Sequence, residues 1–555
     1  MDDMVALFEA LFAPKNTFSL TDLLGKSYLP KELPPPFSSK SFASAMTNAK
    51  APVPVGCEFT QKDDKWCSYT AFSLARPGAI RRRLAILHPV AYYRLASEVV
   101  KHQDSLFKLA SPGVVSLSHP KVSPKGQRAI TTFSGLGALP EARAKNRVGK
   151  RYVLRTDVAN FYPSIYTHAL DWAITGKAKA KKNFKGKVNR FGKRIDELVM
   201  AAQAGQTRGL PIGPDTSLLL AHVVLAPIDK SLKKAGFGHG FRFMDDYELT
   251  FVDRADADRA LSALLSALSV YELELNSLKT RIEELPLEID SSAILAIKAM
   301  PLRQKSSAQQ ADLISLFNAA FTLAKSHPDK PILQYTVGRL NNSVTDKKNA
   351  TLIQDLVLQC ATIEPGVWPK ALPLLKRLHA EQVFTKDPIA NVIEVTIEKQ
   401  ASLGHSSEVA WCLWAGLVFG LSLSRVAVKS VIRMEDDVSI LLLLHASELG
   451  FATIDAAGMK RLKVLVIRDQ LYGEHWLLAY ESVIKGWIKP TGGNYLPKEP
   501  AFKFLQGKKV SFYDTAQLNE LTDSSATDDV ELFGYGSFDD DLDYNDEVME
   551  LIGDD

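Results

Sequence analysis

The chain has 555 residues, of which 46% are hydrophobic and 23% charged. This composition is ordinary for a globular protein, and the length allows about two to four domains. The acidic start, Met1-Asp2-Asp3, precedes no apolar run, so no secretory signal is expected. The longest apolar stretch, Trp411 to Leu423, is too short to span a bilayer, and the four cysteines lack the Cys-x-x-Cys spacing of zinc sites. We therefore expect a cytoplasmic protein without a membrane partner.

The net charge of +4 conceals a strong asymmetry along the chain. Residues 521–555 contain 13 Asp and Glu and no Lys or Arg. The first 520 residues therefore carry +17, which is the +4 of the whole chain plus the 13 acidic charges of its end. Such a basic body is typical of proteins that hold polyanions, while the acidic end at 516–555 is typical of a disordered tail.

The N-terminal part is expected to be an arm, followed by an arginine-rich segment and a helix. Residues 1–50 combine one short apolar helix with a Pro- and Ser-rich stretch, so an arm is expected, with residues 1–70 reaching the start of the first domain. Arg76, Arg81, Arg82 and Arg83 then precede a helix at 92–100. These arginines form either a solvated loop or a set of donors for a triphosphate or a nucleic-acid backbone.

A strand at 150–158 ends in Asp157 and leads into the aromatic turn Phe161-Tyr162-Pro163. In the next segment, 177–194, nine of 18 residues are Lys or Arg. Charge runs are usually solvated loops, but the basic body makes contact with nucleic acid an equal alternative. The residues expected to make that contact are Lys181, Lys182, Lys185, Lys187 and Arg190.

A Gly- and Pro-rich turn at 206–217 precedes an apolar helix at 218–225. Residues 241–251 then alternate apolar and polar positions around Asp245 and Asp246, which predicts a β-hairpin with carboxylates at its turn. An amphipathic helix is expected at 255–271 and a strand-like element at 273–281. Beyond residue 305 the hydrophobic period becomes helical, which favours stacked helix pairs in a solenoid-like array at 304–515.

Asp157 and the pair Asp245-Asp246 are carboxylates of the kind that hold two divalent cations. Two metal ions about 4 Å apart clamp the attacking and leaving oxygens of an in-line phosphoryl transfer. Mg²⁺ is the expected ion, with Mn²⁺ as the alternative, because Mg²⁺ prefers oxygen ligands and shares its shell with phosphates. Adjacent strand residues point to opposite faces, so Asp157 and Asp245 are expected to be the essential ligands and Asp246 a third.

The chain resembles reverse transcriptases over roughly residues 70–300. Asp157 with Phe161-Tyr162 resembles their first palm motif, and residues 206–217 resemble the Gly-x-Pro-x-Gly motif that supports template and primer. Phe243-Met244-Asp245-Asp246 resembles the Tyr-x-Asp-Asp motif, with Phe in place of Tyr, and Lys279 lies in a sequence similar to the following palm motif.

The resemblance implies a role for each matching residue. Asp157, Asp245 and Asp246 would be catalytic, and together with Val158 they would bind the metal. Tyr162 would be the gate against a ribose 2′-hydroxyl, and Arg82 or Arg83 would contact the incoming dNTP. The implied nucleotide-binding set is Arg82, Arg83, Phe161, Tyr162, Gly209, Pro211, Gly213 and Lys279.

Residues 161–168 and 213–217 show a narrower similarity to bacterial abortive-infection and defence-associated reverse transcriptases, including those of the unknown groups. This likeness implies an α+β right-hand fingers–palm core at 71–303, an all-α helical-repeat domain at 304–515, and a homo-oligomer. It also implies DNA synthesis in anti-phage defence, with DNA and RNA as partners. Untemplated synthesis, priming from a protein hydroxyl and a noncoding RNA partner all remain open.

Two alternatives to a defence polymerase follow from the same residues. One is a retron- or intron-like reverse transcriptase that copies a specific noncoding RNA. The other is a non-catalytic RNA-binding scaffold or toxin, in which the palm would be a relic. The intact Asp157, Asp245 and Lys279 argue against the second alternative.

Overall fold

The computed structural model describes residues 17–61, 64–78, 81–111, 116–123, 126–182, 191–381 and 385–518. The expected nucleic-acid contacts Lys185, Lys187 and Arg190, and the acidic tail beyond residue 518, lie outside these ranges. None of the described helices is long and apolar enough to cross a membrane.

All strand pairings within the named sheets are antiparallel. Two hairpins stand alone and one sheet has four strands in the order β6-β7-β5-β8. The strands are β1 (Thr70–Ala75), β2 (Arg81–Ile86), β3 (Pro120–Val122), β4 (Ile130–Thr132), β5 (Tyr152–Asp157), β6 (Gly240–Phe243), β7 (Asp246–Phe251) and β8 (Arg281–Glu284).

The four-stranded sheet forms because its strands alternate between two faces. Leu154 of β5 lies opposite Leu249 of β7, and both side chains are fully buried. One position later, Arg155 lies opposite Glu248, so a charged pair occupies the other face. The predicted hairpin is confirmed, with β6 and β7 joined by the two-residue turn Met244-Asp245.

Helices surround the sheets in the N-terminal half. They are α2 (Leu20–Lys26), α3 (Lys40–Met46), α4 (Pro89–Lys101), α5 (Gln103–Ala110), α6 (Leu139–Asn146), α7 (Phe161–Ser164), α8 (His168–Thr175), α9 (Lys177–Lys182), α10 (Phe191–Ala201), α11 (Asp215–Lys234) and α12 (Arg254–Ser269). Helix α11 is the central one, since it packs against α5, α8 and α12. The apolar helix expected at 218–225 is thus the middle of a longer helix, and the helix expected at 255–271 is α12.

The prediction of an N-terminal arm is wrong for the residues that the structure describes. Helices α2 and α3 pack against each other, and Leu23, Leu24 and Phe42 are fully buried. Ser19 closes a capping box with Asp22 at the start of α2, which satisfies the first amides of that helix. The short apolar segments therefore fold into the core, because their side chains find partners far along the chain.

The strand-like element predicted at 273–281 is also wrong for most of its length. Asn276 organises a turn instead, since its side chain accepts from the Leu278 amide at 3.1 Å and its carbonyl accepts from the Lys279 amide at 3.2 Å. Asn competes for backbone hydrogen bonds in this way, which disfavours a strand. Only β8, which begins at Arg281, joins the sheet.

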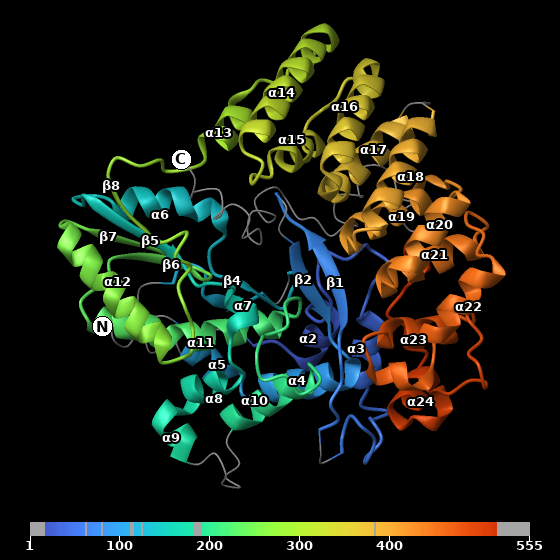
Figure 1. Cartoon of the computed structure of the whole chain (residues 1–555), viewed down its shortest axis with the longest axis horizontal. Coiled ribbons are helices and arrows are strands. Elements are labelled where there is room, and N and C mark those ends of the chain that lie inside the picture. Colours follow the sequence, from blue (N-terminus) through green and yellow to red (C-terminus); the bar gives the residue numbers. More distant parts are fainter. Residues whose placement is uncertain are drawn as a thin grey trace.

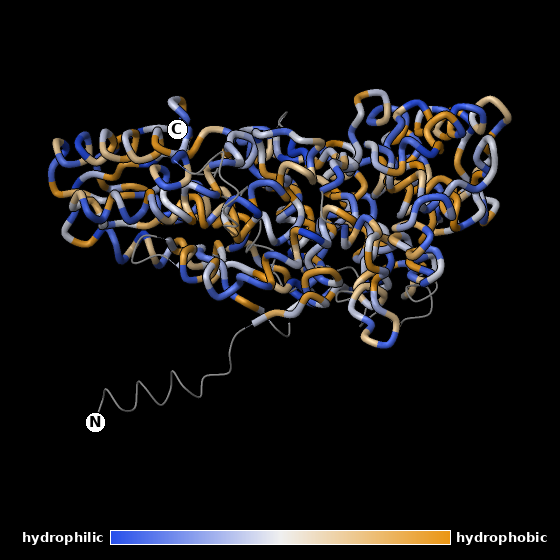
Figure 2. The backbone as a smooth tube through the Cα atoms, turned by 90° about the horizontal axis from the view of Figure 1, so that it is seen from below, coloured by the Kyte–Doolittle hydropathy of each residue, from blue (hydrophilic) through white to orange (hydrophobic). Residues whose placement is uncertain are grey.

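The C-terminal half is helical, as predicted. Its helices are α13 (Ser292–Ala299), α14 (Ser306–Ser326), α15 (Ile332–Asn341), α16 (Ala350–Ile363), α17 (Trp368–Glu381), α18 (Asp387–Ala401), α19 (Ser406–Phe419), α20 (Arg425–Met434), α21 (Asp437–Glu448), α22 (Ala456–Leu465), α23 (Trp476–Ile484) and α24 (Pro500–Gly507). Each packs mainly on its neighbours along the chain, so the helices follow an arc (Figure 1). Figure 2 shows hydrophobic and hydrophilic residues alternating along the outer helices, as expected of amphipathic packing.

The helical half closes back onto the N-terminal half. The indole of Trp476 donates to the Ile86 carbonyl at 3.0 Å, and that of Trp411 donates to the Glu32 carbonyl at 3.0 Å. Near its described end the chain returns to α3, where the Ser41 hydroxyl donates to the Ser511 carbonyl at 2.7 Å. The hairpin β1–β2 consequently lies between the sheet and the helical arc (Figure 1).

Candidate active site

Strand β5 and the hairpin β6–β7 bring the three predicted carboxylates to one end of the sheet. Asp157, the last residue of β5, is paired with Asp246, the first residue of β7. The amide of Val158 donates to the carbonyl of Asp245 at 3.3 Å. Asp245 occupies the turn, so strand alternation does not determine its direction. The pairing places Asp246 directly across from Asp157, which the sequence did not reveal.

The turn that carries Asp245 is held in an uncommon backbone conformation. Met244 has a φ of +51°, a region that L-residues other than Asn and Asp seldom occupy. The Met244 amide donates to the Ser118 hydroxyl at 2.6 Å. The guanidinium of Arg242 donates to the carbonyl of Met244. Arg242 is itself fixed by Asp229 through a 2.7 Å ion pair and is completely buried. The surrounding structure thus imposes the turn, as is common at functional sites.

The two side-chain oxygens of Asp157 have different surroundings. Oδ2 lies 3.4 Å from the ammonium nitrogen of Lys279. Oδ1 is buried and accepts no hydrogen bond from any residue that the structure describes. A buried ionised oxygen without a donor is costly in free energy, and a bound cation would remove that cost.

The donor set also agrees with a hard divalent ion, since all candidate ligands are oxygens. The structure holds no three His, Cys, Asp or Glu side chains close enough to enclose a metal ion among the residues it describes. Mg²⁺ usually takes one or two carboxylates and fills its shell with water and substrate phosphates. The site therefore fits an ion that is completed by its substrate.

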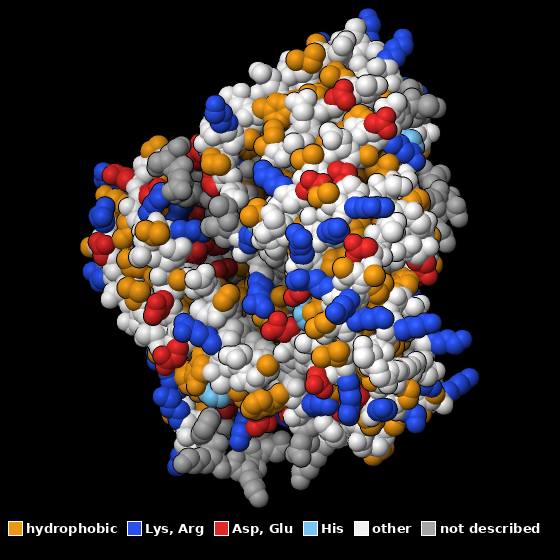
Figure 3. All heavy atoms as spheres, turned by 45° about the vertical axis from the view of Figure 1, so that its right-hand side comes forward, with side chains coloured by type: hydrophobic (Ala, Val, Ile, Leu, Met, Phe, Trp, Pro, Cys, Tyr) orange, Lys and Arg blue, Asp and Glu red, His pale blue; other side chains and the backbone are white. Residues whose placement is uncertain are grey.

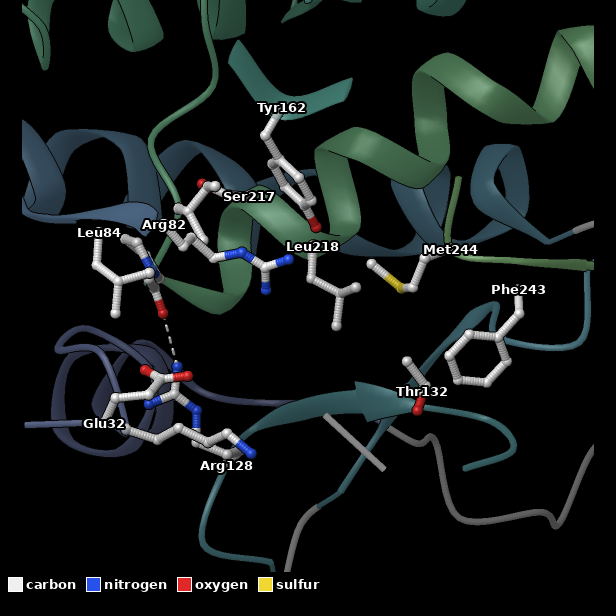
Figure 4. A pocket seen from close by; sticks show the side chains of 14 residues that line it. Glu32, Arg82, Leu84, Arg128, Thr132, Tyr162, Ser217, Leu218, Phe243 and Met244 are labelled. Carbon is white, nitrogen blue, oxygen red and sulfur yellow. Dashed lines mark hydrogen bonds between the residues drawn. The ribbon is translucent and has the colours of Figure 1, made fainter. Parts of the chain in front are cut away.

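A pocket lies beside this end of the sheet and collects residues from six parts of the chain (Figure 4). Its lining includes Arg82 from β2, Tyr162 from α7 and Met244 from the hairpin turn. In Figure 4 the guanidinium of Arg82 and the hydroxyl of Tyr162 point toward the middle of the pocket. The other lining residues are Lys31, Glu32, Leu84, Arg128, Thr132, Ile212, Gly213, Pro214, Ser217, Leu218 and Phe243.

Arg82 and Arg83 differ because neighbouring residues of a strand face opposite ways. Arg82 lines the pocket, whereas Arg83 is exposed and its guanidinium lies 5.4 Å from the centre of the Tyr69 ring. Phe161 is buried against Tyr162, with ring centres 5.3 Å apart. Phe161 therefore contributes to the pocket by supporting Tyr162.

The Gly- and Pro-rich turn forms one wall of the pocket and depends on its glycines. Gly213 has a φ of +139°, and an added Cβ would lie 2.8 Å from Pro30 Cγ and 2.9 Å from the Ala85 carbonyl oxygen. Gly209 also has a positive φ, and Pro211 accepts from the Ser217 hydroxyl at 2.6 Å. The turn thus requires glycine for close approach to the N-terminal segment and to β2.

Arg128 and Asp215 form a largely buried ion pair that the sequence did not predict. Asp215 is completely buried and accepts from Arg128 Nε at 2.8 Å and from the Ser27 hydroxyl. Arg128 also donates to the Gly213 carbonyl at 3.0 Å. Burial raises the pKa of the Asp215 carboxyl, although Arg128 opposes that shift. The sequence signalled only that Asp215 follows the turn, and nothing in it paired Arg128 with that residue.

The remaining expected contacts lie apart from this pocket. Lys181 and Lys182 are exposed on α9. Lys and Arg side chains also lie around the hollow between the two halves of the molecule (Figure 3). This distribution is suitable for holding a nucleic-acid backbone.

Comparison with known proteins identifies the part of the chain that carries this site. Residues 79–308 match the family described as reverse transcriptase (RNA-dependent DNA polymerase), and no curated protein matches the chain. The match spans all four strands of the central sheet, the pocket turn and strand β2, consistent with the fingers–palm fold of that family. Residues 79–308 therefore form a reverse transcriptase domain, which makes this protein an RNA-directed DNA polymerase and hence a nucleotidyltransferase.

Proposed function

We propose that Asp157 and Asp245 hold divalent cations, Mg²⁺ or Mn²⁺, and that the enzyme adds dNTPs to a DNA 3′ end or to a primer hydroxyl. The buried Oδ1 of Asp157, which lacks a donor among the described residues, is the observation that carries this proposal. The carbonyl of Val158 and the carboxylate of Asp246 are the further oxygen ligands, because both lie at the same end of the sheet. Bound cations supply charge stabilisation at the attacking and leaving oxygens.

The residues around the cations orient the substrate. Lys279 compensates the charge of Asp157 and fixes the direction of its carboxylate. Arg82 is a better candidate than Arg83 for pairing with the triphosphate, because Arg82 lines the pocket and a planar guanidinium suits phosphate oxygens. Tyr162, which lines the same pocket, is the proposed gate against a ribose 2′-hydroxyl. Gly209, Pro211 and Gly213 shape the wall on the template side.

The proposed biological role is anti-phage defence. It is supported by the similarity of residues 161–168 and 213–217 to defence-associated reverse transcriptases, and by the helical half that follows the polymerase domain. Homo-oligomer formation, a noncoding RNA partner and protein priming belong to the same proposal. A covalent link between DNA and the purified protein would identify protein priming directly.

Replacing Asp245 tests the metal site. Asp245→Ala removes an oxygen ligand, so incorporation of labelled dNTPs with Mg²⁺ is expected to fall by at least about 100-fold, as electrostatic stabilisation of a transition state typically contributes this much. The same variant is expected to abolish any reduction in phage plating that the wild-type chain gives when it is expressed in bacteria.

The matched control is Asp258→Ala, the same change at an exposed position of α12. It should leave both measurements unchanged. Incorporation by Asp245→Ala at the wild-type rate would refute the proposed metal site, whereas loss of incorporation with unchanged phage plating would refute only the defence role.

A further inference from the structure

A second pocket lies between α8, α9 and α10, apart from the residues that line the nucleotide pocket. It is lined by Tyr166, His168, Trp172, Lys181 and Asp196, among others. The metal site and the nucleotide pocket use none of these residues. Its lining combines aromatic rings with the carboxylates of Asp171, Asp196 and Glu197 and the ammonium groups of Lys181 and Lys193.

The aromatic side is built from Tyr166 and Trp172. Their ring centres are 5.6 Å apart with an interplanar angle of 65°, and both residues line the pocket. The ammonium groups of Lys177 and Lys181 lie 4.1 and 5.5 Å from the centre of the Trp172 ring. The pocket therefore has an aromatic wall of two inclined rings with positive charge over one of them, and aromatic rings and cations together are typical of sites that hold a base and its phosphate.

The acidic base of the pocket is the carboxylate of Asp196, whose side chain is only 6% exposed. Its Oδ2 lies 2.5 Å from His168 Nδ1. Its Oδ1 is buried and accepts no hydrogen bond from any residue in the described ranges. The hydrogen bond that the imidazole of His168 makes to the Asp196 carboxylate raises the pKa of His168. A ligand that completes this site must bring an N–H or O–H donor.

The rim of the pocket is rich in lysine. Helix α9 carries Lys177, Lys179, Lys181 and Lys182 within six residues, and Lys193 lies at the start of α10 on the pocket wall. Phosphate groups are the natural partners of such a rim, since the first 520 residues of the chain carry a large positive charge.

We infer that this pocket binds one base of a single-stranded nucleic acid, and that the base carries an exocyclic amino group. The amino group donates to Asp196 Oδ1, the ring packs against Tyr166 and Trp172, and the lysines of the rim contact the adjoining phosphates. Cytosine and adenine present an amino donor in this way, whereas uracil has a carbonyl oxygen in place of the cytosine amino group, which the carboxylate repels, and offers only the single N–H of N3. This inference rests on the proposed function only in that a polymerase brings single-stranded nucleic acid to the protein. Binding of the base in this pocket requires neither dNTP nor metal.

The test compares two ligands whose bases differ at C4, where an amino group is replaced by a carbonyl oxygen, and at N3, which then carries a hydrogen. Fluorescence anisotropy would measure the dissociation constants of labelled oligodeoxycytidine and oligodeoxyuridine with the full chain, without metal or dNTP. The wild-type protein is expected to bind oligodeoxycytidine about tenfold more tightly, which corresponds to one hydrogen bond to a charged group. Asp196→Asn, which replaces one acceptor oxygen by a donor, is expected to abolish that preference.

Two further variants separate base recognition from phosphate contact. Lys181→Ala is expected to weaken the binding of both ligands equally and to keep the preference. Lys460→Ala, the same change at an exposed lysine of α22, is the matched control and should leave both dissociation constants unchanged. Equal binding of the two ligands by the wild-type protein, or an unchanged preference in Asp196→Asn, would overturn the inference. Neither outcome depends on the proposed metal site.

A crosslinking measurement on the wild-type protein covers the case in which Asp196→Asn fails to fold. Oligodeoxycytidine with a 5-iodocytosine at one position is irradiated in the complex, and the attached peptide is identified by mass spectrometry. Crosslinks at Tyr166 or Trp172 support the pocket. Crosslinks found only in other parts of the chain would refute it.

Discussion

At the scale of single residues, buried charge is concentrated on the face of the sheet that α6 covers. Glu248 of β7 is 3% exposed and lies 3.0 Å from Arg143, 2.8 Å from Arg147 and 3.6 Å from Arg155. Burial alone would raise the pKa of Glu248, but the three arginines outweigh it and hold that pKa below the usual value of 4.5. The carboxylate therefore balances the charge of one buried and two largely buried arginines next to the palm sheet.

Glu248→Gln should destabilise the protein by about 3–5 kcal/mol at pH 7, because it leaves buried guanidinium groups without their counter-charge. The folded-state pKa of Glu248 is depressed, so the stabilisation is present above the unfolded-state pKa and is lost as the pH falls through the folded-state value. Denaturant unfolding of wild type and variant across pH 3–8 would measure this, and the two curves should converge in acid.

The matched control within the same cluster is Glu283→Gln. Glu283 is a half-exposed partner of Arg155 at 3.3 Å, so its replacement should lower the free energy of unfolding by less than about 1 kcal/mol. A difference between wild type and Glu248→Gln that stays constant down to pH 3 would contradict the assigned cause.

At the scale of elements, the hairpin β1–β2 connects the nucleotide pocket to the helical half. Arg81 Nη1 and Nη2 lie 2.6 and 2.7 Å from the two carboxylate oxygens of Glu408 in α19. The amide of Ala75 donates to the hydroxyl of Ser407 at 2.8 Å. Both strands are thus held by α19 at the turn end of the hairpin, where Ala75 pairs with Arg81, and the next residue after Arg81 is Arg82, which lines the pocket.

Glu408→Gln should weaken the hold of α19 on the hairpin and let Arg82 move away from the triphosphate. The expected result is a KM for dNTP raised about tenfold, since a bidentate charge-assisted pair is lost, with kcat changed by less than about twofold. Steady-state incorporation kinetics at varied dNTP concentration would measure both constants. Glu435→Gln is the control, because Glu435 pairs with Arg461 on the surface, away from the hairpin. A fall in kcat at constant KM would exclude this positioning role.

At the scale of the whole molecule, the reverse transcriptase domain and the helical half share one hydrophobic core. His88 is fully buried between them, and its Nε2 lies 2.8 Å from the Leu471 carbonyl oxygen. The indole of Trp476 bonds to the Ile86 carbonyl in the same region. The domain boundary predicted near residue 303 therefore separates an α+β part from an all-helical part, and the two parts pack against each other.

A chain ending at residue 303 should be unstable, because it exposes the apolar surface that α19 and α23 cover and leaves the Ile86 carbonyl without its donor. The measurement is soluble yield and thermal unfolding of the fragment. A chain ending at Leu518 is the control, since it keeps every described contact and should unfold as the full chain does. A 1–303 fragment that is soluble and incorporates dNTPs at the wild-type rate would contradict this expectation.

The sequence alone predicted the features of the site that depend only on the local backbone conformation. A carboxylate at the end of a strand, an acidic pair at a hairpin turn and glycines at positive φ are each specified by a few neighbouring residues, and the structure contains the strand, the hairpin and the glycine conformations. The helical period after residue 305 likewise predicted helices, because amphipathic spacing is a local signal. The roles of these residues in catalysis remain predictions for the variants above.

Only the tertiary structure decided which distant residues meet. It placed Asp246 across from Asp157, joined Arg128 to Asp215, and docked α19 against β1 through Arg81 and Glu408. It also folded α2 and α3 into the core, where the Pro- and Ser-rich sequence had indicated an arm. These contacts join residues that are about 90 to more than 300 positions apart in most cases, and their partners are selected by packing and by the burial of charge. No periodicity or local motif in the sequence carries that information.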